Sequence, residues 1–546
     1  MKGLSYRVNY SPNVRFLPNY SYRRQDPYLT SNLSFARKIN TNSYDWVLEN
    51  ILTFKRQLNV NHYVDLTLMQ GRNHRENETT SANSNQLVTD VLGWNNLGLG
   101  TTLTNTSGGD KTDGVSYMFR TNYNFKKRYL ATFTVRRDGS SVFAENNKYA
   151  TFPSGSLAWI ISDETFLSDS RILDLLKIRL SYGAVGNQAI RPYQSISVLG
   201  TTRYVFSDGG ASSLGFFPNN MGNSDLKWET TYAANLGLDF ELLKGRVGGT
   251  VELYNMDTKD LLVTRSLPTM TGYASVWTNL GQINNKGIEI TLNTINVRKQ
   301  KFEWRTNFTF SANRNKIVHL YGSDTDGDGK EDDDLGNRWF IGQPITTYFD
   351  YVQDGIYQVD DEIPSGFVPG DVRLKDLNDN GIIDADDRTI IGHGGQPKYR
   401  WGISNDLVYG PVTLSVFVNA MQGWISNLDL LIPPGDNRQM NFLDYGWWTP
   451  ENRSNVRPST LYKNRFGHKF YLSRDFVRIQ DVTLSYNVPN LILEKIRVSN
   501  MRVSLSGKNL YTFTDWVGQD PESGSVDRTS LYPMPRTITL GLNMSF

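Results

Sequence analysis

The sequence of 546 residues contains no cysteine, which excludes disulfide bridges, thiolate metal sites and cysteine nucleophiles. A chain without cysteine also suits a protein that crosses an oxidising periplasm. Histidine is scarce, and the five histidines are scattered and form no H-E-x-x-H zinc pattern. The G-x-S-x-G elbow and the phosphate-binding G-x-x-x-x-G-K pattern are both absent from the sequence. We therefore expect no enzyme activity and predict no catalytic residue.

The chain also lacks an excess of charge of either sign. Lysine and arginine number 57 against 55 aspartates and glutamates, so the formal net charge is +2. A balance of this kind gives no electrostatic footprint for a polyanion, and we expect no nucleic-acid partner.

Long apolar runs are missing as well, because no stretch approaches the 18 apolar residues that a membrane-spanning helix needs. A β-barrel would escape this test, since only alternate residues of its strands meet lipid. No low-complexity linker and no shift of composition marks a domain boundary, which favours one architecture over residues 1–546.

The clearest pattern that is present lies in the last ten residues. Apolar residues occupy every second position there: Ile538, Leu540, Leu542, Met544 and Phe546. Such a period of two predicts a β-strand with one apolar face. An edge strand of a soluble sandwich would alternate in the same way, so this strand alone leaves both architectures open. The terminal aromatic also resembles the closing strand of bacterial outer-membrane barrels, and Phe546 is our candidate assembly signal.

Repetition of the pattern favours the barrel. The same alternation returns over 115–125, 178–182, 302–310, 412–418 and 501–505, with Arg, Lys, Asn, Ser or Thr on the second face. Aromatic residues near strand ends are typical of membrane-interface girdles; they are Tyr123, Phe125, Tyr129, Trp401 and Tyr409. The fold class that we predict is all-β, a transmembrane antiparallel β-barrel with about 16–18 strands and long extracellular loops.

Several details of this barrel follow from the local pattern. Short turns near residues 125–128 and 408–411 alternate with long loops, of which the longest span about 184–225, 318–396 and 421–470. A slip of the alternation between Ile479 and Val482 predicts a β-bulge. The first hundred residues predict weaker strands at about 4–10, 29–36, 45–57 and 60–69, then a polar stretch and a short loop helix over 86–92.

The strongest candidate site lies in the second of these long loops. Residues 376–387 (DLNDNGIIDADD) follow the spacing of a twelve-residue calcium loop, with glycine at the sixth position. The predicted ligands are Asp376, Asn378, Asn380, Ile382 through its carbonyl, Asp384 and Asp387. Asp387 stands where the spacing rule expects glutamate, and no flanking helices are predicted. The alternative is a solvated turn rich in Asp and Asn.

Two weaker candidates share the long loops. Asp324, Asp326, Asp328 and Asp332 have similar spacing, but the twelfth position is Leu335, so an unstructured acidic loop tip is an equal alternative. Either ion would be a structural Ca²⁺ that stiffens a loop. Tyr445, Trp447 and Trp448 form an aromatic cluster whose rings could stack on sugars, although packing within the loop or an interface girdle is the favoured interpretation.

From about residue 113 onward, six stretches in order resemble the SusC/RagA family of TonB-dependent outer-membrane transporters. They are 137–143 (RDGSSVF), 176–188 (LKIRLSYGAVGNQ), 226–230 (LKWET), 279–289 (NLGQINNKGIE), 337–342 (NRWFIG) and 369–376 (PGDVRLKD). The resemblance implies a 22-stranded barrel filled by an amino-terminal plug and opened by TonB. It also implies a SusD-like surface lipoprotein as partner, outer-membrane lipid around the barrel, and the outer membrane of a Gram-negative bacterium as the location.

The chain departs from the family pattern at its amino end. We expect the chain to lack a signal peptide, a TonB box and a plug, and to form the carboxy-terminal part of a barrel without its first four to six strands. The resemblance implies uptake of an oligosaccharide or a peptide by the parent protein, with TonB contacting the missing plug region. The alternative function is a non-transporting structural or adhesive β-protein at the cell surface, with loops stiffened by calcium.

Overall fold

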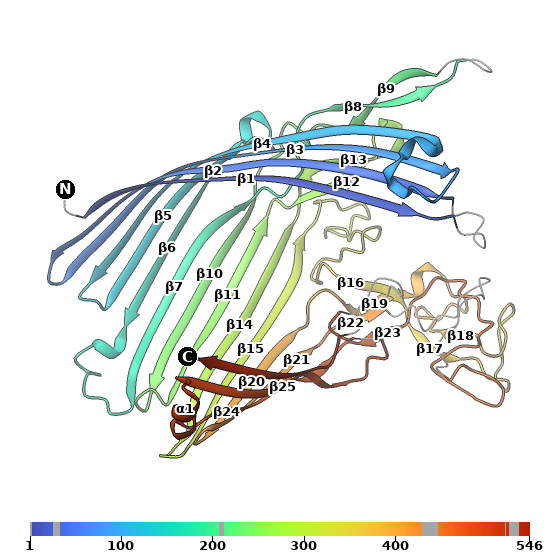
Figure 1. The fold of residues 1–546 in the computed structure, drawn as a ribbon. Coiled ribbons are helices and arrows are strands. Elements are labelled where there is room, and N and C mark those ends of the chain that lie inside the picture. Colours follow the sequence, from blue (N-terminus) through green and yellow to red (C-terminus); the bar gives the residue numbers. More distant parts are fainter. Residues whose placement is uncertain (1–2, 26–32, 207–211, 428–445, 519, 524–533) are drawn as a thin grey trace. The chain divides into compact units, whose positions relative to one another are not determined.

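The computed structural model describes residues 3–25, 33–206, 212–427, 446–518, 520–523 and 534–546. Sixteen strands among them form one sheet, in which each strand pairs with the next in the sheet order (Figure 1). In sheet order they are β1 (Leu4–Arg23), β2 (Phe35–Asn59), β3 (His62–Leu87), β4 (Gly100–Phe125), β5 (Tyr129–Ser140), β6 (Tyr149–Ile160), β7 (Leu173–Asn187), β10 (Glu229–Leu242), β11 (Val247–Lys259), β14 (Gln282–Arg298), β15 (Phe302–His319), β20 (Tyr399–Tyr409), β21 (Val412–Gln422), β24 (Phe476–Asn487), β25 (Asn500–Thr514) and β26 (Thr537–Ser545). The number agrees with the predicted 16–18.

Smaller elements lie in the described parts of the connections. Five two-stranded sheets pair β8 (Val198–Tyr204) with β9 (Ser213–Asn220), β12 (Leu262–Ser266) with β13 (Ser275–Asn279), β16 (Thr347–Tyr351) with β19 (Arg388–His393), β17 (Gln353–Ile356) with β18 (Val372–Leu374), and β22 (Ile425–Asn427) with β23 (Tyr471–Ser473). The helices are α1 (Asn490–Ile496) and the single 3-10 turns η1 (Gly93–Asn95), η2 (Leu97–Leu99), η3 (Glu145–Asn147), η4 (Ile161–Asp163), η5 (Thr269–Thr271) and η6 (Ala385–Asp387).

None of the helices in the described part of the chain has the length and apolarity to cross a membrane.

Two compact units divide the chain. The first comprises residues 1–159, 179–234 and 257–282, and the second comprises residues 160–178, 235–256 and 283–546.

In the first unit, the registers of β1 to β6 align apolar side chains in a row across six strands. Tyr6, Leu52, Leu68, Phe119, Val135 and Pro153 are successive partners in this row. One residue along each strand, the partners are all polar: Ser5, Thr53, Thr67, Arg120, Thr134 and Ser154. Because neighbouring residues of a strand point to opposite faces, this part of the sheet has one apolar face and one polar face.

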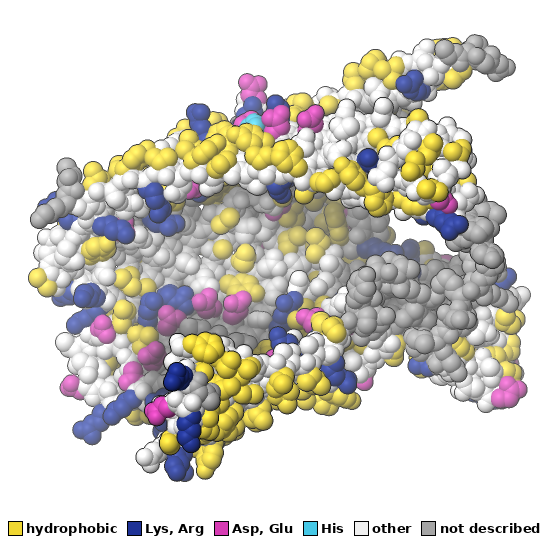
Figure 2. Space-filling model, in the orientation of Figure 1, with side chains coloured by type: hydrophobic (Ala, Val, Ile, Leu, Met, Phe, Trp, Pro, Cys, Tyr) yellow, Lys and Arg dark blue, Asp and Glu magenta, His cyan; other side chains and the backbone are white. Residues whose placement is uncertain are grey.

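The second unit repeats this arrangement with different residues. Trp304, Leu407, Leu414, Leu484, Leu505 and Leu540 are partners across β15, β20, β21, β24, β25 and β26. The adjacent row is polar and consists of Arg305, Asp406, Ser415, Thr483, Ser506 and Thr539. On β26, Leu540 is 77% exposed, so its apolar face meets the surroundings and not a protein core. Figure 2 shows hydrophobic side chains gathered over the first strands and over the last ones.

Most connections alternate in length, as predicted, and residues 161–172 and 488–499 are the longer connections on the short-turn side. Residues 126–128 join β4 to β5, and residues 410–411 join β20 to β21. At the other strand ends, long connections run over 188–228, 320–398 and 423–475, close to the predicted loop bounds. The turn between β4 and β5 places both Lys126 and Lys127 in the left-handed region, with φ values of 54° and 57°. Two such residues give a type I′ turn, whose twist matches that of the flanking strands.

Predicted girdle aromatics gather at the short-turn ends of the strands. The rings of Phe125 and Tyr129 stack with centroids 6.0 Å apart, and Tyr129 stacks on Trp159 at 6.3 Å. Tyr409 ends β20 and is 64% exposed. Trp401 lies near the opposite end of β20, where its Nε1 donates to Gln422 Oε1 over 3.3 Å.

The predicted bulge is confirmed, and the prediction for the first hundred residues is partly wrong. The register shifts between Ile479 and Asp481 against β25, as the slipped alternation indicated. In contrast, β1 extends to Arg23, and β3 continues through the polar stretch to Leu87. The predicted helix over 86–92 does not form, and η1 and η2 follow it instead. Of the predicted strand over 29–36, residues 29–32 lie outside the described residues.

A polar ladder explains why β3 extends past its apolar part. Thr41 and Thr79 Oγ1 atoms lie 3.0 Å apart, Ser43 Oγ donates to Asn77 Oδ1 over 2.8 Å, and Asn77 Nδ2 donates to Asp110 Oδ1 over 2.9 Å. The backbone ladder of β2, β3 and β4 needs no apolar face to form, so it continues where the hydrophobic alternation has ended.

Candidate functional site

The candidate calcium loop, residues 376–387, connects β18 to β19 in the second unit. Several of its side chains accept hydrogen bonds from the backbone of the loop itself. The carboxylate of Asp376 accepts hydrogen bonds from the backbone of Asn380 at 3.3 Å and of Gly381 at 2.7 Å. Asn378 Oδ1 accepts a hydrogen bond from the backbone N–H of Asn380, and Asn380 Oδ1 accepts one from the backbone N–H of Ile382. Gly381 has a φ of 81°, a conformation that a side chain at this sixth position would strain.

Asp387, at the twelfth position, closes the loop through its backbone. One of its oxygens accepts from Leu377 N and the other from Asp384 N, each over 2.8 Å, and the residue is fully buried. Asp384 caps η6 by accepting from Asp386 N over 2.8 Å. The N–H groups of Asp384 and Leu377 hold the pKa of Asp387 below its usual value, so its carboxylate remains charged.

The second acidic loop brings its carboxylates closer together. Oxygens of Asp324, Asp326 and Asp332 lie within 4.8 Å of one another, which suits a shared cation. Asp328 points elsewhere, with Lys330 Nζ 3.5 Å from its Oδ2. Among the described residues, Asp324, Asp326 and Asp332 are the one group of three or more His, Cys, Asp or Glu side chains whose ligand atoms lie this close together. Spacing alone does not show which oxygens converge, so the sequence could not indicate this convergence.

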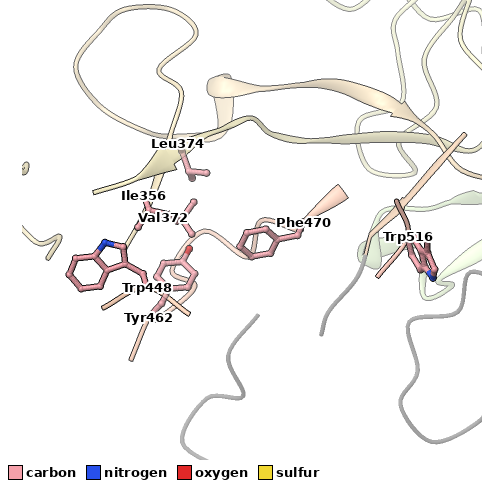
Figure 3. Packing of buried hydrophobic residues seen from close by; sticks show 7 residues of the cluster. All are labelled: Ile356, Val372, Leu374, Trp448, Tyr462, Phe470 and Trp516. Atoms are coloured by element: carbon pink, nitrogen blue, oxygen red, sulfur yellow. The ribbon is translucent and has the colours of Figure 1, made fainter. Parts of the chain in front are cut away.

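A hydrophobic core lies beside the candidate calcium loop. It consists of Ile356, Val372, Leu374, Trp448, Tyr462, Phe470 and Trp516, with Ile383 packed against it (Figure 3). Leu374 just precedes residues 376–387 and Ile383 lies within them, so this core holds both limbs of the candidate calcium loop. The described parts of the connections 320–398 and 423–475 therefore have a packed core of their own.

The predicted aromatic cluster belongs largely to this packing. Trp447 and Trp448 are 8% and 6% exposed, and Trp448 Nε1 donates to Gln358 Oε1 over 2.9 Å. Their burial is what the packing alternative predicts, and it leaves little ring surface for stacking on a sugar. Tyr445 lies outside the described residues.

Sequence reasoning did not find a buried histidine in the same loops. His468 is fully buried, and its Nδ1 lies 3.0 Å from Asn464 Oδ1 and 3.2 Å from the Tyr462 hydroxyl. Burial lowers the pKa of His468 to about 4, because the charged imidazolium would lose its hydration. An isolated histidine in a polar loop carries no pattern that marks it for burial.

A second missed feature is the ion-pair network around Arg478. This side chain is 1% exposed, and it contacts Asp520 at 2.9 Å and Glu522 at 2.7 Å. Arg474 donates to the carbonyl of Pro521 over 2.7 Å and lies 3.6 Å from the Trp424 ring centre. The two arginines on and beside β24 thus fasten residues 520–522 of the connection between β25 and β26. Their partners are some 40 residues away, so no local pattern reveals them.

The polar face of the first unit is hollowed. A cavity of about 440 Å³ is lined there by Arg120, Arg136, Asp138 and Ser154 among others. Arg136 and Asp138 form an ion pair of 2.8 Å, and Arg120 Nε donates to Thr134 Oγ1 over 3.2 Å. Charged groups and hydroxyls on this face can bind water or a polar solute. The other predicted residue, Phe546, follows β26 and is 89% exposed.

Comparisons with known proteins agree with this geometry. The family model described as "TonB dependent receptor-like, beta-barrel" matches residues 2–510. TonB-dependent receptor P3 of Formosa agariphila is 35% identical over 88% of this chain and 50% of its own length. TonB-dependent receptor SusC of Bacteroides thetaiotaomicron is 30% identical over 79% of this chain and 44% of its own length. The chain thus spans about half the length of the curated relatives it matches.

Solved structures show the same fold. One solved structure is titled "Structure of the RagAB peptide transporter". Its alignment with the present chain covers 100% of this chain and 60% of the solved chain, with a TM-score of 0.82 and 23% sequence identity. The match supports the β-barrel fold class and the antiparallel sheet described above.

The buried His468 predicts a pH dependence. Its pKa is about 4 in the folded loops and ordinary, near 6.5, in the unfolded chain, so the unfolded state gains a proton first as the pH falls. Stability is therefore complete above roughly pH 6.5 and falls by roughly 3 kcal/mol at most by pH 4. Urea unfolding of the chain in detergent, followed by tryptophan fluorescence at pH 7.5 and 4.5, measures this loss.

His468→Gln should reduce the pH dependence of the unfolding free energy, whereas His319→Gln, at an exposed site, should retain it. Equal pH dependence in the wild type and His468→Gln would contradict the assignment.

Proposed function

Because the chain belongs to the TonB-dependent receptor-like β-barrel family, we propose that it forms the barrel part of a nutrient importer energised by TonB. Proteins of the SusC and RagA type, to which the chain is related, are β-barrels of the Gram-negative outer membrane, and this is its location. One observation carries the proposal: adjacent rows of partners, one apolar and one polar, cross the strands in both units. The apolar rows suit lipid, and the polar rows suit the wet lumen through which a polar nutrient passes.

The parent protein would import an oligosaccharide or a peptide. We place residues 1–546 in the carboxy-terminal part of the barrel domain, with TonB acting through a plug region of the whole protein. A SusD-like surface lipoprotein is the partner that this class of barrel suggests. Folded long loops, held by the core around Trp448 and Tyr462, offer such a partner an ordered surface. The alternative is a structural or adhesive surface protein, which would have the same barrel without uptake.

Uptake by cells tests the importer. Deletion of the whole gene should reduce uptake of either labelled oligosaccharides or labelled peptides at least tenfold, and loss of TonB should have the same effect. Restoring the gene recovers uptake, and affinity purification of the restored protein recovers a surface lipoprotein. If uptake of both nutrient classes stays unchanged while adhesion of the cells falls, the importer is wrong and the structural alternative takes its place.

We also propose that the two acidic loops bind structural Ca²⁺. Three converging carboxylates support the loop of Asp324, Asp326 and Asp332, and inward oxygens with a left-handed glycine support the loop of Asp376. Each ion would join oxygens that otherwise repel one another, and so stiffen its loop.

Calorimetric titration of Ca²⁺ into the full chain tests both sites. Asp326→Asn should remove one binding event and Asp376→Asn the other, since each loses a ligand charge. Asp328→Asn is the matched control, because Asp328 faces Lys330 and should leave both events unchanged. Heats identical to the wild type for the first two variants would remove the calcium sites.

A further inference from the structure

The apolar face of the first unit carries charged and aromatic residues at one edge of its apolar band. Continuing along the same face from Leu68, β3 presents Arg72 and then His74. Arg72 pairs across the sheet with Val115, and His74 pairs with Asp113. On β5, Arg137 follows Val135 on this face. All these residues lie toward the strand ends that carry the long loops, away from the short turns.

Two hollows lie side by side across this edge. One is an apolar groove of about 480 Å³, lined by Tyr6, Leu52, Leu68, Phe119 and Val135, with Arg137 at its border. The other, of about 430 Å³, is lined by Trp46, Arg72, Val115 and Tyr149 among others. Tyr117 lines both hollows, so the apolar groove leads directly to the basic and aromatic one. In Figure 2, charged side chains lie next to the hydrophobic row over the first strands.

The basic hollow is shaped by specific packing. The Arg137 guanidinium lies 5.4 Å from the centre of the Tyr149 ring. Tyr149 leans over Gly139, where a Cβ atom would come within 2.5 Å of the ring. Any larger residue at position 139 would displace the ring and the arginine stacked on it, so glycine keeps this hollow open.

The local acids are already paired. Asp113 contacts His74 Nδ1 at 2.8 Å, and Glu76 contacts Lys111 Nζ at 2.8 Å. Within the described residues, neither Arg72 nor Arg137 forms an ion pair with a carboxylate, and both are exposed. Arg72 pairs with Val115 and Arg137 with Tyr117, so two strand spacings and a two-residue offset separate their backbones by roughly 12 Å, which their long side chains can bridge from both sides. Two positive charges thus remain at the end of an apolar groove.

We propose that this surface binds one phosphorylated glycolipid of the outer leaflet. An acyl chain would lie in the groove beside Leu52, Leu68 and Phe119, where burial of apolar surface stabilises it. A phosphate of the headgroup would lie between Arg72 and Arg137, because guanidinium groups bind phosphate through charge-assisted hydrogen bonds. The rings of Trp46 and Tyr149 would cover the sugar. Long loops mark the extracellular ends of outer-membrane strands, so the site faces the outer leaflet.

Native mass spectrometry of the full chain in detergent, with lipid A as the probe, tests the site. The wild type should bind one lipid A, and Arg72→Gln together with Arg137→Gln should weaken binding at least tenfold. Arg56→Gln is the matched control, because Arg56 is exposed on the same face at the short-turn end of β2 and should leave binding unchanged.

The lipid itself provides a second arm that needs no variant. Lipid A from which the phosphates have been removed, and phosphatidylglycerol, should each bind the wild type at least tenfold more weakly than lipid A. Equal binding of lipid A with and without phosphates would overturn the proposal, as would equal binding by the wild type and a double variant that still shows heat-modifiable gel migration. Tighter binding of phosphatidylglycerol would overturn the choice of a glycolipid.

Discussion

Hydrogen bonding between neighbouring strands is the constraint on which this structure depends. In lipid, no water satisfies a backbone N–H or C=O, so every strand of a spanning sheet must find its partners in the next strand. In the described residues, the antiparallel order from β1 to β26 meets that need for every strand that has a neighbour on both sides, with each strand pairing only with the next in the order. The pleat then sends alternate side chains to opposite faces. One set of registers therefore creates both the leucine-rich row through Leu414 and Leu505 and the polar row through Ser415 and Ser506.

Because backbone hydrogen bonds do not depend on apolar side chains, the strands can also extend beyond the apolar band. Beyond the apolar band, β2, β3 and β4 continue as a polar sheet held by side-chain contacts such as Ser43 with Asn77. Elsewhere the long loops fold on their own cores, where Trp448, Tyr462 and the buried His468 pack together. Ordered loops can present a defined surface to a partner molecule. The Arg478 network orders a loop segment as well, because this buried strand residue forms ion pairs with Asp520 and Glu522 in the connection between β25 and β26.

How much the sequence predicted depends on how local each signal is. Alternation of period two is local, so the fold class, the strand number, the loop bounds and the bulge after Ile479 could be predicted. Strand length beyond the apolar band could not, because polar strands lack that period and were interpreted as loop. Ligand spacing identified both acidic loops, yet only coordinates show that Asp324, Asp326 and Asp332 converge while Asp387 is engaged by backbone. Features that join distant segments, such as His468 with Tyr462 or Arg478 with Asp520, left no pattern in the chain.

The central claim is that one face of the sheet meets lipid and the other meets water, and the absence of cysteine makes it directly measurable. Single cysteines at positions 117 to 124 of β4, carrying nitroxide spin labels in proteoliposomes, can be probed with oxygen and with a water-soluble nickel chelate. The account predicts a period of two, with oxygen accessibility highest at 117, 119, 121 and 123, and nickel accessibility highest at 118, 120, 122 and 124. Accessibilities without this alternation would contradict the two-faced sheet.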